Sequence, residues 1–569
     1  MSDQVEVVRE AEAWAADDPS LTDAEVLKQL IEQQAWDELS ERMGAPLEFG
    51  TAGLRGLVGA GRSRMNLANV VRATRGFADY LLSRVPDAKT RPVVVGRDAR
   101  LTSAELEEAT RGVLTAARIP VRHFTRPVPT PIVAYVARQL AASGAVCVTA
   151  SHNPPAYNGY KVYAEDAAQI APPVDAEIAR RIAQVGSTKA VPSGGSTELL
   201  EAVPESLIDR YFAELSALRP RLVADRAFPI VYTPLHGVAG EFTLRALAEA
   251  GFAEVHPVPE QLAPDGHFPT LDFPNPEEPG ALALAEALAD EHHAELVLAN
   301  DPDGDRLAVA VKSPAGRWVQ LTGNQVGVLL ADYLLAAAPL TPQRLVISTI
   351  VSTPMTARLA EAYGARTERT LTGFKWIWRA ALRLEEQGGV RTTFGFEEAL
   401  GYSAGHLVRD KDGISAAVLF ADLVAALRQQ GLTVLERLQQ LAREHGLWVS
   451  VQRSVTLVGQ SGAEAIAQAM ARLRASPPSR IGERDVVSVT DYMVGAEARP
   501  EWLPQADVVE LSLADGRVVI RPSGTEPKLK IYVDLARDVH DALTVIGVEC
   551  ELTPEAQALA DDVVRLLGL

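Results

Sequence analysis

Short apolar runs alternate with longer amphipathic stretches along most of the chain. The apolar runs predict buried strands at residues 93–95, 144–150, 230–233, 296–300, 345–349 and 392–396. Between them, stretches such as 281–291 and 355–362 carry apolar residues at helical spacing. Strands that alternate with helices predict α/β units with parallel sheets. Binding groups in such sheets gather at the carboxyl ends of strands, and the polar motifs of this chain follow the predicted strands.

The two ends of the chain depart from this pattern. The first forty-odd residues look helical, and Thr22 to Glu25 fit a capping box that would start a helix. After about residue 446, the segments 508–514 and 517–521 flank Asp515-Gly516, which is a strong hairpin signal. A further strand is expected at 529–535. We therefore predict a smaller C-terminal α+β domain with an antiparallel sheet.

The chain has 569 residues, which corresponds to about four domains of ordinary size. We expect three α/β domains and the C-terminal α+β domain. The predicted boundaries are 1–205 with the N-terminal helix and α/β domain I, 206–325 for domain II, 326–445 for domain III, and 446–569 for domain IV. Linkers are expected in the Gly- and Ser-rich segment 186–197 and near residue 446.

Composition narrows the class of protein. The hydrophobic fraction of 47% is typical of a globular protein, and a net charge of −19 disfavours nucleic-acid binding. Only two cysteines, Cys147 and Cys550, are present, which favours a reducing compartment without a disulfide framework. The N-terminus does not resemble a signal peptide, and the apolar segment 326–335 is too short to cross a bilayer. These features predict a cytoplasmic protein with no nucleic-acid or membrane partner.

Ser151 ends one apolar run and is followed by His152, Asn153 and Pro154. Alone, this is most often a turn, and the absence of a Gly-x-Ser-x-Gly elbow disfavours a hydrolase triad. If the serine were phosphorylated, it would carry nearly two negative charges and would need a cation nearby. Lys161 lies ten residues further on. It could fold back to transfer a proton, with a pKa lowered by neighbouring cations, or it could be a surface lysine.

Three aspartates that could hold such a cation, Asp301, Asp303 and Asp305, alternate after the predicted strand 296–300. Carboxylates this close repel one another without a metal, and their hard oxygens suit Mg²⁺. An EF-hand is excluded, because Arg306 and Lys312 stand where Gly and Glu are required. An acidic turn is the alternative. Arg306 could steady the carboxylates or contact a substrate.

Three further loops carry candidate binding groups. The segment 521–528 combines cationic and hydroxyl side chains with a glycine, which suits a phosphate monoester, although it could simply join two strands. Glu397 and Glu398 could accept hydrogen bonds from sugar hydroxyls or could be an exposed helix start. The glycine-rich loop 50–56 contains Arg55 and lacks the Gly-Lys-Ser/Thr ending of a nucleotide P-loop.

In this order, the motifs resemble those of the α-D-phosphohexomutase superfamily, most of all its phosphoglucomutase-2/phosphopentomutase-like branch. The resemblance spans about residues 45–535 and includes the segments 273–278, 372–375 and 409–413. It implies three related α/β domains and a C-terminal α+β domain around a central active-site cleft. It also implies a phosphoserine at Ser151, with Mg²⁺ held by the serine and the three aspartates.

The resemblance assigns roles to the remaining residues. Arg55 and Lys161 match active-site basic positions, and His152 is a further candidate for proton transfer. The residues expected to bind substrate are Arg306, Lys375, Glu397, Glu398, Arg521, Ser523, Gly524, Thr525 and Lys528.

The implied activity is that of a phosphoglucomutase, which interconverts glucose 1-phosphate and glucose 6-phosphate. The reaction would pass through a phosphoserine enzyme, with glucose 1,6-bisphosphate as intermediate and activator. Many hexose-specific members have a serine where this chain has Ala399, so phosphopentomutase and phosphomannomutase activities stay open. Rivals of other classes are a metal-dependent sugar phosphatase and a non-catalytic sugar-phosphate sensor. We expect a monomer or a weak homo-oligomer.

Overall fold

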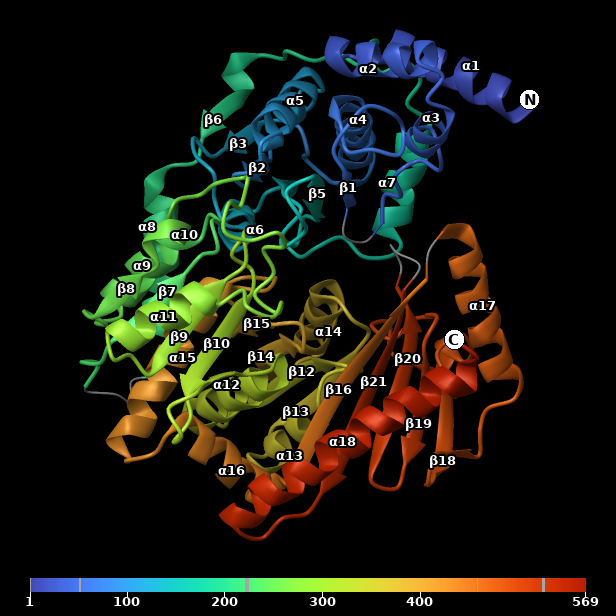
Figure 1. Ribbon diagram of the computed structural model, residues 1–569. Coiled ribbons are helices and arrows are strands. Elements are labelled where there is room, and N and C mark those ends of the chain that lie inside the picture. The colour runs from blue at the N-terminus through green and yellow to red at the C-terminus, as the bar shows by residue number, and fades with distance from the viewer. Residues whose placement is uncertain (1, 51–52, 221–224, 458, 524–527) are drawn as a thin grey trace. The chain divides into compact units, whose positions relative to one another are not determined.

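The computed structural model describes residues 2–50, 53–220, 225–457, 459–523 and 528–569. Its contacts divide the chain into two compact units, which are described separately. The first unit comprises Met1–Arg219, Arg226–Gln320 and Gly401–Leu419, and the second comprises Pro220–Asp225, Leu321–Leu400 and Phe420–Leu569. Figure 1 colours the chain from blue at its N-terminus to red at its C-terminus.

The first unit begins with three helices and then builds a six-stranded sheet in the order β1-β5-β4-β2-β3-β6. Strands β4, β2, β3 and β6 are parallel, and β5 and β1 add an antiparallel edge. Helices α4, α5 and α7 cover one face of this sheet and α6 covers the other (Figure 1). The bounds are α1 (Ser2–Asp17), α2 (Leu21–Glu32), α3 (Trp36–Arg42), β1 (Leu54–Leu57), α4 (Leu67–Arg84), β2 (Val93–Arg97), α5 (Ser103–Ala116), β3 (Val121–His123), α6 (Thr130–Gln139), β4 (Gly144–Val148), β5 (Tyr157–Tyr163), α7 (Val174–Ala183), η1 (Thr197–Leu199) and β6 (Leu200–Ala202).

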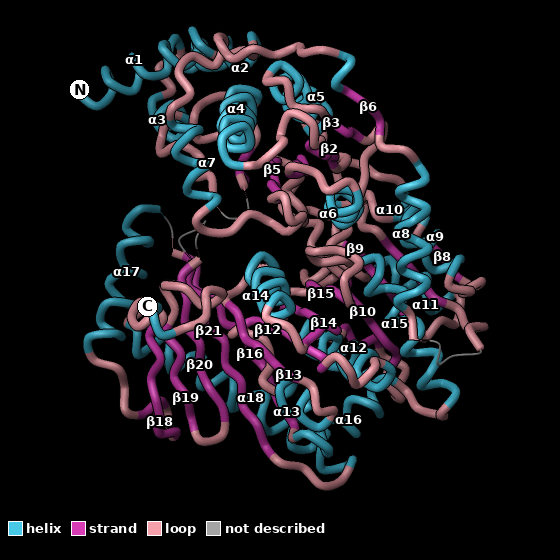
Figure 2. Tube along the Cα trace, turned by 180° about the vertical axis from the view of Figure 1, so that it is seen from behind, coloured by secondary structure: helices cyan, strands magenta, loops and turns pink. Residues whose placement is uncertain are grey.

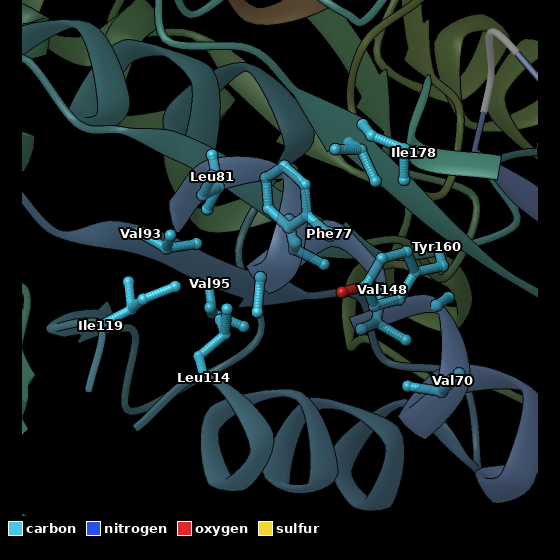
Figure 3. Close-up of a cluster of buried hydrophobic side chains, with 14 of the residues drawn as sticks. Val70, Phe77, Leu81, Val93, Val95, Leu114, Ile119, Val148, Tyr160 and Ile178 are labelled. Carbon is cyan, nitrogen blue, oxygen red and sulfur yellow. The ribbon is translucent and has the colours of Figure 1, made fainter. Parts of the chain in front are cut away.

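The core of this sheet explains why its strands form. Val93, Val95 and Val148 are fully buried and pack with Phe77 of α4 and Ile178 of α7 (Figure 3). Strands buried on both faces read as continuous apolar runs, which is the pattern that predicted them. The packing fixes the end of β4, and Ser151 follows that end after two residues.

The first unit also contains a five-stranded sheet in the order β11-β10-β9-β7-β8. Its strands β8, β7 and β9 are parallel, while β10 returns antiparallel to β9 and pairs Leu307 with Asn300. The three aspartates lie in the turn between β9 and β10. The bounds are α8 (Glu205–Leu218), β7 (Ile230–Thr233), α9 (Gly240–Glu249), β8 (Val255–Pro257), α10 (Pro259–Leu262), α11 (Ala283–Glu291), β9 (Leu296–Asn300), β10 (Leu307–Lys312), β11 (Trp318–Gln320) and β15 (Gly401–Ala404).

The second unit contains a parallel array, β13-β12-β14, and an antiparallel sheet in the order β16-β21-β20-β19-β18-β17. Figures 1 and 2 show α18 across one face of the antiparallel sheet from opposite sides. The bounds are α12 (Gly323–Ala337), β12 (Gln343–Thr349), α13 (Met355–Ala362), β13 (Arg366–Thr370), α14 (Phe374–Glu386), β14 (Val390–Glu397), α15 (Gly413–Gln429, which starts in the first unit), α16 (Val434–His445), β16 (Leu447–Thr456), α17 (Gly459–Ala475), β17 (Arg480–Ile481), β18 (Arg484–Asp491), η2 (Ala496–Ala498), β19 (Val509–Leu513), β20 (Gly516–Pro522), β21 (Lys528–Arg537) and α18 (Ala542–Leu567).

The predicted class, α/β blocks followed by an antiparallel α+β domain, is confirmed. The start of α2 is a correction, because its N-cap is Ser20, whose hydroxyl accepts the Asp23 N–H at 3.2 Å, rather than Thr22. Near residue 446, Gly446 alone separates the end of α16 at His445 from the start of β16 at Leu447. Among the described residues, no single helix has the length and apolar composition of a membrane span. Among these residues, only α15 and α16 taken together have that length and composition, and the two helices are bent by 86° relative to each other.

Candidate active site

Ser151 sits in a tight loop at the carboxyl end of β4. Its φ of +53° is in the left-handed region, which residues other than glycine seldom adopt, and the residue is only 3% exposed. The Ser151 N–H donates to the Thr149 hydroxyl at 2.9 Å, and its Oγ donates to Asp301 Oδ2 at 2.8 Å. Strained conformations of this kind persist where surrounding contacts hold them, and they cluster at functional sites.

The aspartates form one buried cluster. Asp301, Asp303 and Asp305 are at most 1% exposed, and each offers a carboxylate oxygen within 4.8 Å of the other two. Gly304, at φ +72°, lets the chain turn between Asp303 and Asp305. The structure therefore brings together a serine and three aspartates that lie about 150 residues apart in the sequence.

Cationic side chains surround this cluster. Lys161, on β5, donates to Asp303 Oδ2 at 2.6 Å and to Asp305 Oδ2 at 2.8 Å. The Lys411 ammonium lies 3.3 Å from Asp305 Oδ2. The Arg306 guanidinium lies 3.9 Å from Asp301 Oδ2, and the Arg306 main-chain N–H donates to Asp301 Oδ1 at 2.9 Å. Opposite charges at these distances offset much of the repulsion between buried carboxylates.

The three carboxyl groups differ in their tendency to ionise. Burial raises the pKa of Asp301 well above its ordinary value, and the charges of Asp305 and Asp303 raise it further. For Asp303 and Asp305 burial acts in the same direction, but the pKa of both groups is lowered because several contributions together outweigh burial. Lys161 is the largest of them for both groups, and Lys411 and Arg306 add to it for Asp305. The cluster thus concentrates its negative charge beside Lys161. A further cation would be needed to ionise Asp301 as well.

The donor set fits a magnesium ion. Within the described part of the chain, Asp303 Oδ1 and Asp305 Oδ1 are buried and have no hydrogen-bond partner. Buried acceptors without partners are rare, and hard carboxylate oxygens are the ligands that Mg²⁺ prefers. Asp301, Asp303 and Asp305 would hold the ion, next to the hydroxyl of Ser151.

Two more of the predicted residues lie beside the serine. His152 Nδ1 is 3.3 Å from Ser151 Oγ, and the Arg55 guanidinium donates to Asn153 Oδ1 at 3.0 Å. Burial lowers the pKa of His152 well below 6.5, and the charges of Arg306 and Arg55 lower it further. The His152 ring is therefore neutral at pH 7.

The expected lowering of the Lys161 pKa is not found. Burial alone would lower it, but Asp303 and Asp305 outweigh burial and raise the Lys161 pKa above its ordinary value. The reason is that the neighbours of Lys161 are carboxylates rather than cations. In this arrangement Lys161 is a proton donor and a counter-ion.

In the second unit, Glu397 ends β14 and Glu398 follows it, and the two carboxylates are held by different partners. Glu397 Oε1 accepts the Gly373 N–H at 2.9 Å. Glu398 Oε2 accepts the hydroxyls of Thr349 at 3.2 Å and Ser352 at 3.3 Å. Burial, with a smaller contribution from Glu397, raises the pKa of Glu398 to about 7. One of these carboxyls can therefore change its charge near neutral pH.

Three of the predicted phosphate-binding residues, Arg521, Ser523 and Lys528, lie at the end of β20 or the start of β21. Arg521 is the last but one residue of β20 and donates to the Thr372 hydroxyl, and the Ser523 N–H donates to the carbonyl of Lys528 at 2.7 Å. Gly524 and Thr525 lie outside the described residues. Lys375, in the first turn of α14, places its ammonium 5.6 Å from the centre of the Trp376 ring.

Sequence reasoning missed two contacts of the aspartate cluster. Thr130, at the start of α6, donates its hydroxyl to Asp303 Oδ2 at 2.8 Å, and Lys411 faces Asp305. The signal for Lys411 was its place between two aspartates in the segment 409–413. Thr130 carries no local signal, since a threonine at a helix start is common.

Four family models match the chain in order. They describe the phosphoglucomutase/phosphomannomutase alpha/beta/alpha domain I at residues 46–189, domain II at 209–316, domain III at 322–445 and the C-terminal domain at 462–541. The chain belongs to the α-D-phosphohexomutase superfamily. The three α/β domains and the C-terminal domain of this superfamily account for the sheets described above.

Relatives within the phosphohexomutase superfamily differ in the sugar that their names give. A probable phosphomannomutase from Haemophilus influenzae is 39% identical and covers 85% of this chain and 96% of its own length. A phosphopentomutase from Mus musculus is 35% identical over 93% of this chain and 90% of its own length. A phosphoglucomutase from Staphylococcus epidermidis is 32% identical over 92% of this chain and 96% of its own length.

A solved phosphohexomutase structure agrees on the fold. Parafusin, a phosphoglucomutase from Paramecium in an open form, superposes with a TM-score of 0.66 at 17% identity and covers 93% of this chain and 97% of its own. The chain is thus a mutase of the phosphohexomutase family, and its aspartate cluster is consistent with the Mg²⁺ site of that family.

Proposed function

We propose that this mutase is a phosphoglucomutase, which interconverts glucose 1-phosphate and glucose 6-phosphate. The single observation that carries the proposal is the 2.8 Å hydrogen bond from Ser151 Oγ to Asp301, in a cluster whose donors fit Mg²⁺. A phosphoryl group on this oxygen would stand beside the cation that its charge requires. The serine therefore acts as the phosphoryl carrier, and no hydrolytic triad surrounds it among the described residues.

The proposed reaction has two transfers of the same kind. In the first, the bond between Ser151 Oγ and phosphorus breaks while a bond forms from phosphorus to the free hydroxyl oxygen of the sugar phosphate. The hydroxyl proton would pass to His152, whose Nδ1 lies 3.3 Å from Ser151 Oγ, and from His152 to Ser151 Oγ as that oxygen leaves phosphorus. The product, glucose 1,6-bisphosphate, turns around and returns its other phosphoryl group to Ser151.

Positioning and charge neutralisation supply most of the rate enhancement in phosphoryl transfer. When bound, Mg²⁺ would neutralise charge on the transferring group. Lys161 and Arg306 fix the carboxylates that would hold it, and Arg55 fixes the loop through Asn153.

Substrate recognition is assigned to the second unit. Glu397 and Glu398 would accept hydrogen bonds from the sugar hydroxyls, with Lys375 beside them. The phosphate that does not react would be held by Arg521, Ser523, Gly524, Thr525 and Lys528. These phosphate-binding residues would recognise phosphate rather than ring detail, as a substrate that binds in two orientations requires. Arg306 is a further residue that we expect to contact the substrate.

Phosphopentomutase is the second candidate. It is favoured by Ala399, which removes a hydroxyl beside the sugar-binding carboxylates, and by phosphopentomutases at 34–35% identity over 93% of the chain. Phosphomannomutase is the third candidate.

We also propose the four-domain division given above, a cytoplasmic location and a monomeric or weakly associating state. Free Cys147 and Cys550 agree with a reducing compartment.

A comparison of sugars tests the proposed substrate. We expect kcat/KM for glucose 1-phosphate to exceed that for mannose 1-phosphate and ribose 1-phosphate by about tenfold or more, because a site built for one hydroxyl pattern leaves groups unpaired with another. Each sugar is measured with a trace of its own bisphosphate. In Ala399→Ser, the preference for glucose should widen. A higher value for ribose 1-phosphate would replace glucose by pentose as the substrate.

The rivals of other classes give different products. A sugar phosphatase releases inorganic phosphate and needs no phosphate on Ser151, whereas a sensor neither isomerises nor hydrolyses the sugar phosphate. Peptide mass analysis of the purified enzyme is expected to find one extra phosphate on the peptide that contains Ser151. Stoichiometric release of inorganic phosphate would favour the phosphatase instead.

The Glu398 carboxyl gives a pH prediction. Its pKa of about 7 means that the group is protonated at pH 6 and ionised at pH 8, and the ionised form accepts stronger hydrogen bonds from sugar hydroxyls. The kcat/KM of the wild type, divided by that of Glu398→Gln, should therefore rise about tenfold from pH 6 to pH 8. Glu386→Gln on the exposed face of α14 is the control. An unchanged ratio would place the titrating group elsewhere.

A further inference from the structure

Arg100 is a buried arginine that reaches the serine loop from another segment. It lies three residues after β2, and its side chain is 1% exposed. The guanidinium donates to four main-chain carbonyls of that loop. The acceptors are Ser151 at 2.7 Å, Asn153 at 2.5 Å, Pro154 at 2.8 Å and Tyr157 at 2.8 Å.

The guanidinium is itself held from two directions. Asp98 Oδ2 lies 3.3 Å from Arg100 Nε, while Asp98 Oδ1 accepts the Arg100 main-chain N–H at 3.0 Å and the Ser103 hydroxyl at 2.6 Å. The ring of Phe268 covers the guanidinium, with 5.2 Å from the ring centre to Cζ. A side chain fixed in this way acts as a rigid template and not as a mobile surface charge.

The serine loop needs such a template. Four carbonyls converge on one point because the chain turns back on itself between Ser151 and Tyr157, where sheet hydrogen bonds cannot pair them all. Arginine presents five N–H groups in a fixed plane and can satisfy several carbonyls together. An ammonium group is a compact charge with three donors, and it would not span the same set.

We propose that Arg100 is a positioning residue for phosphoryl transfer at Ser151. By binding the carbonyls on both sides of the turn, it keeps Ser151 at its φ of +53° and keeps the Ser151 Oγ 2.8 Å from Asp301. Arg100 acts through the loop, because its guanidinium donates to main-chain carbonyls of the loop rather than to the aspartate cluster. The inference rests on the proposed role of Ser151 as phosphoryl carrier.

The test compares Arg100→Met with Arg72→Met. Arg72, on α4, is a matched control in the same unit, since its guanidinium donates to the carbonyls of Val185 at 2.7 Å and Gly186 at 3.0 Å, away from the serine loop. We expect Arg100→Met to lower kcat about 100-fold with KM within about threefold, because misplacing a reacting atom by about 1 Å has this effect. Arg72→Met should keep kcat within about twofold.

Two further readouts separate positioning from a general loss of structure. Guanidinium ion added to Arg100→Ala should raise kcat at least about tenfold, whereas Arg100→Lys should stay as slow as Arg100→Met. The rate at which Ser151 takes up phosphate from glucose 1,6-bisphosphate, followed by intact mass, should fall in parallel with kcat. If Arg100→Met does not fold, Asp98→Asn replaces it, with an expected loss of kcat of about tenfold, which is half the loss on a logarithmic scale.

The outcomes are distinct. A wild-type kcat in Arg100→Met would overturn the inference, as would a loss of activity that matches the loss of folded protein by circular dichroism and is not rescued by guanidinium. A wild-type enzyme that isomerises sugar phosphates without ever carrying phosphate on Ser151 would instead defeat the proposed function itself.

Discussion

Replacing Ser151 with alanine is expected to lower the mutase kcat by at least about 10⁴-fold, because the variant has no oxygen on which to carry the phosphoryl group. The loop backbone should persist, since its hydrogen bonds involve the main chain of residue 151 and the Arg100 guanidinium. Turnover of glucose 1-phosphate is measured with excess glucose 1,6-bisphosphate, so that slow priming of the enzyme cannot explain the loss.

The matched control for this substitution is Ser143→Ala. Ser143 is also buried in the first unit, but its hydroxyl donates only to the carbonyls of Arg91 and Pro92 at 3.3 and 3.2 Å. The kcat of Ser143→Ala should stay within about twofold of the wild-type value. Intact mass should show phosphate in Ser143→Ala and none in Ser151→Ala. Full mutase activity in Ser151→Ala would show that another group carries the phosphoryl.

The elements that the sequence predicted best are those with abrupt chemical boundaries. The strands β7 and β9 and the helix α13 begin and end where expected, because a polar or proline residue interrupts each apolar pattern. The start of α2 was misplaced because Ser20 and Thr22 each stand three residues before an acidic residue, and local sequence does not say which hydroxyl reaches the helix.

The chemistry of the candidate site was predictable for a different reason. Ser151 and the three aspartates follow apolar strands, and side chains at strand ends gather on one edge of a sheet. The contacts that set their charge were not predictable. Lys161 reaches carboxylates more than 140 residues away, and that contact reversed the expected direction of its pKa shift. Contacts across such separations depend on the packing of two sheets, which no local pattern contains.

The choice of sugar depends on a smaller difference still. Relatives named for mannose, pentose and glucose phosphates share 32–39% identity with this chain, so overall similarity does not separate them. The missing hydroxyl at Ala399 changes one potential hydrogen bond to the substrate. Discrimination of this size needs a kinetic comparison, since one unpaired polar group in a site can change kcat/KM by orders of magnitude.

Removing the metal is expected to have the second large effect. A chelator should lower kcat by at least about 10³-fold, and Mg²⁺ should restore it, because the charge on the transferring group would otherwise be balanced only by side chains. Asp303→Asn should show a similar loss that added Mg²⁺ restores poorly. Asp303 Oδ1 is one of the two buried oxygens without a partner, and an amide in place of the carboxylate would also weaken the contact with Lys161.

Thermal unfolding supplies a readout that does not depend on catalysis. Because Mg²⁺ would bind the folded cluster and not the unfolded chain, about 100 times its Kd should stabilise the wild type by about 2.7 kcal/mol. Asp303→Asn should show little of this shift. The control Asp290→Asn removes a surface carboxylate paired with Lys312 and should keep the full shift, together with wild-type activity. Equal shifts in both variants would show that the metal does not bind at the three aspartates. The electrostatic argument for phosphoryl transfer at Ser151 would then fail.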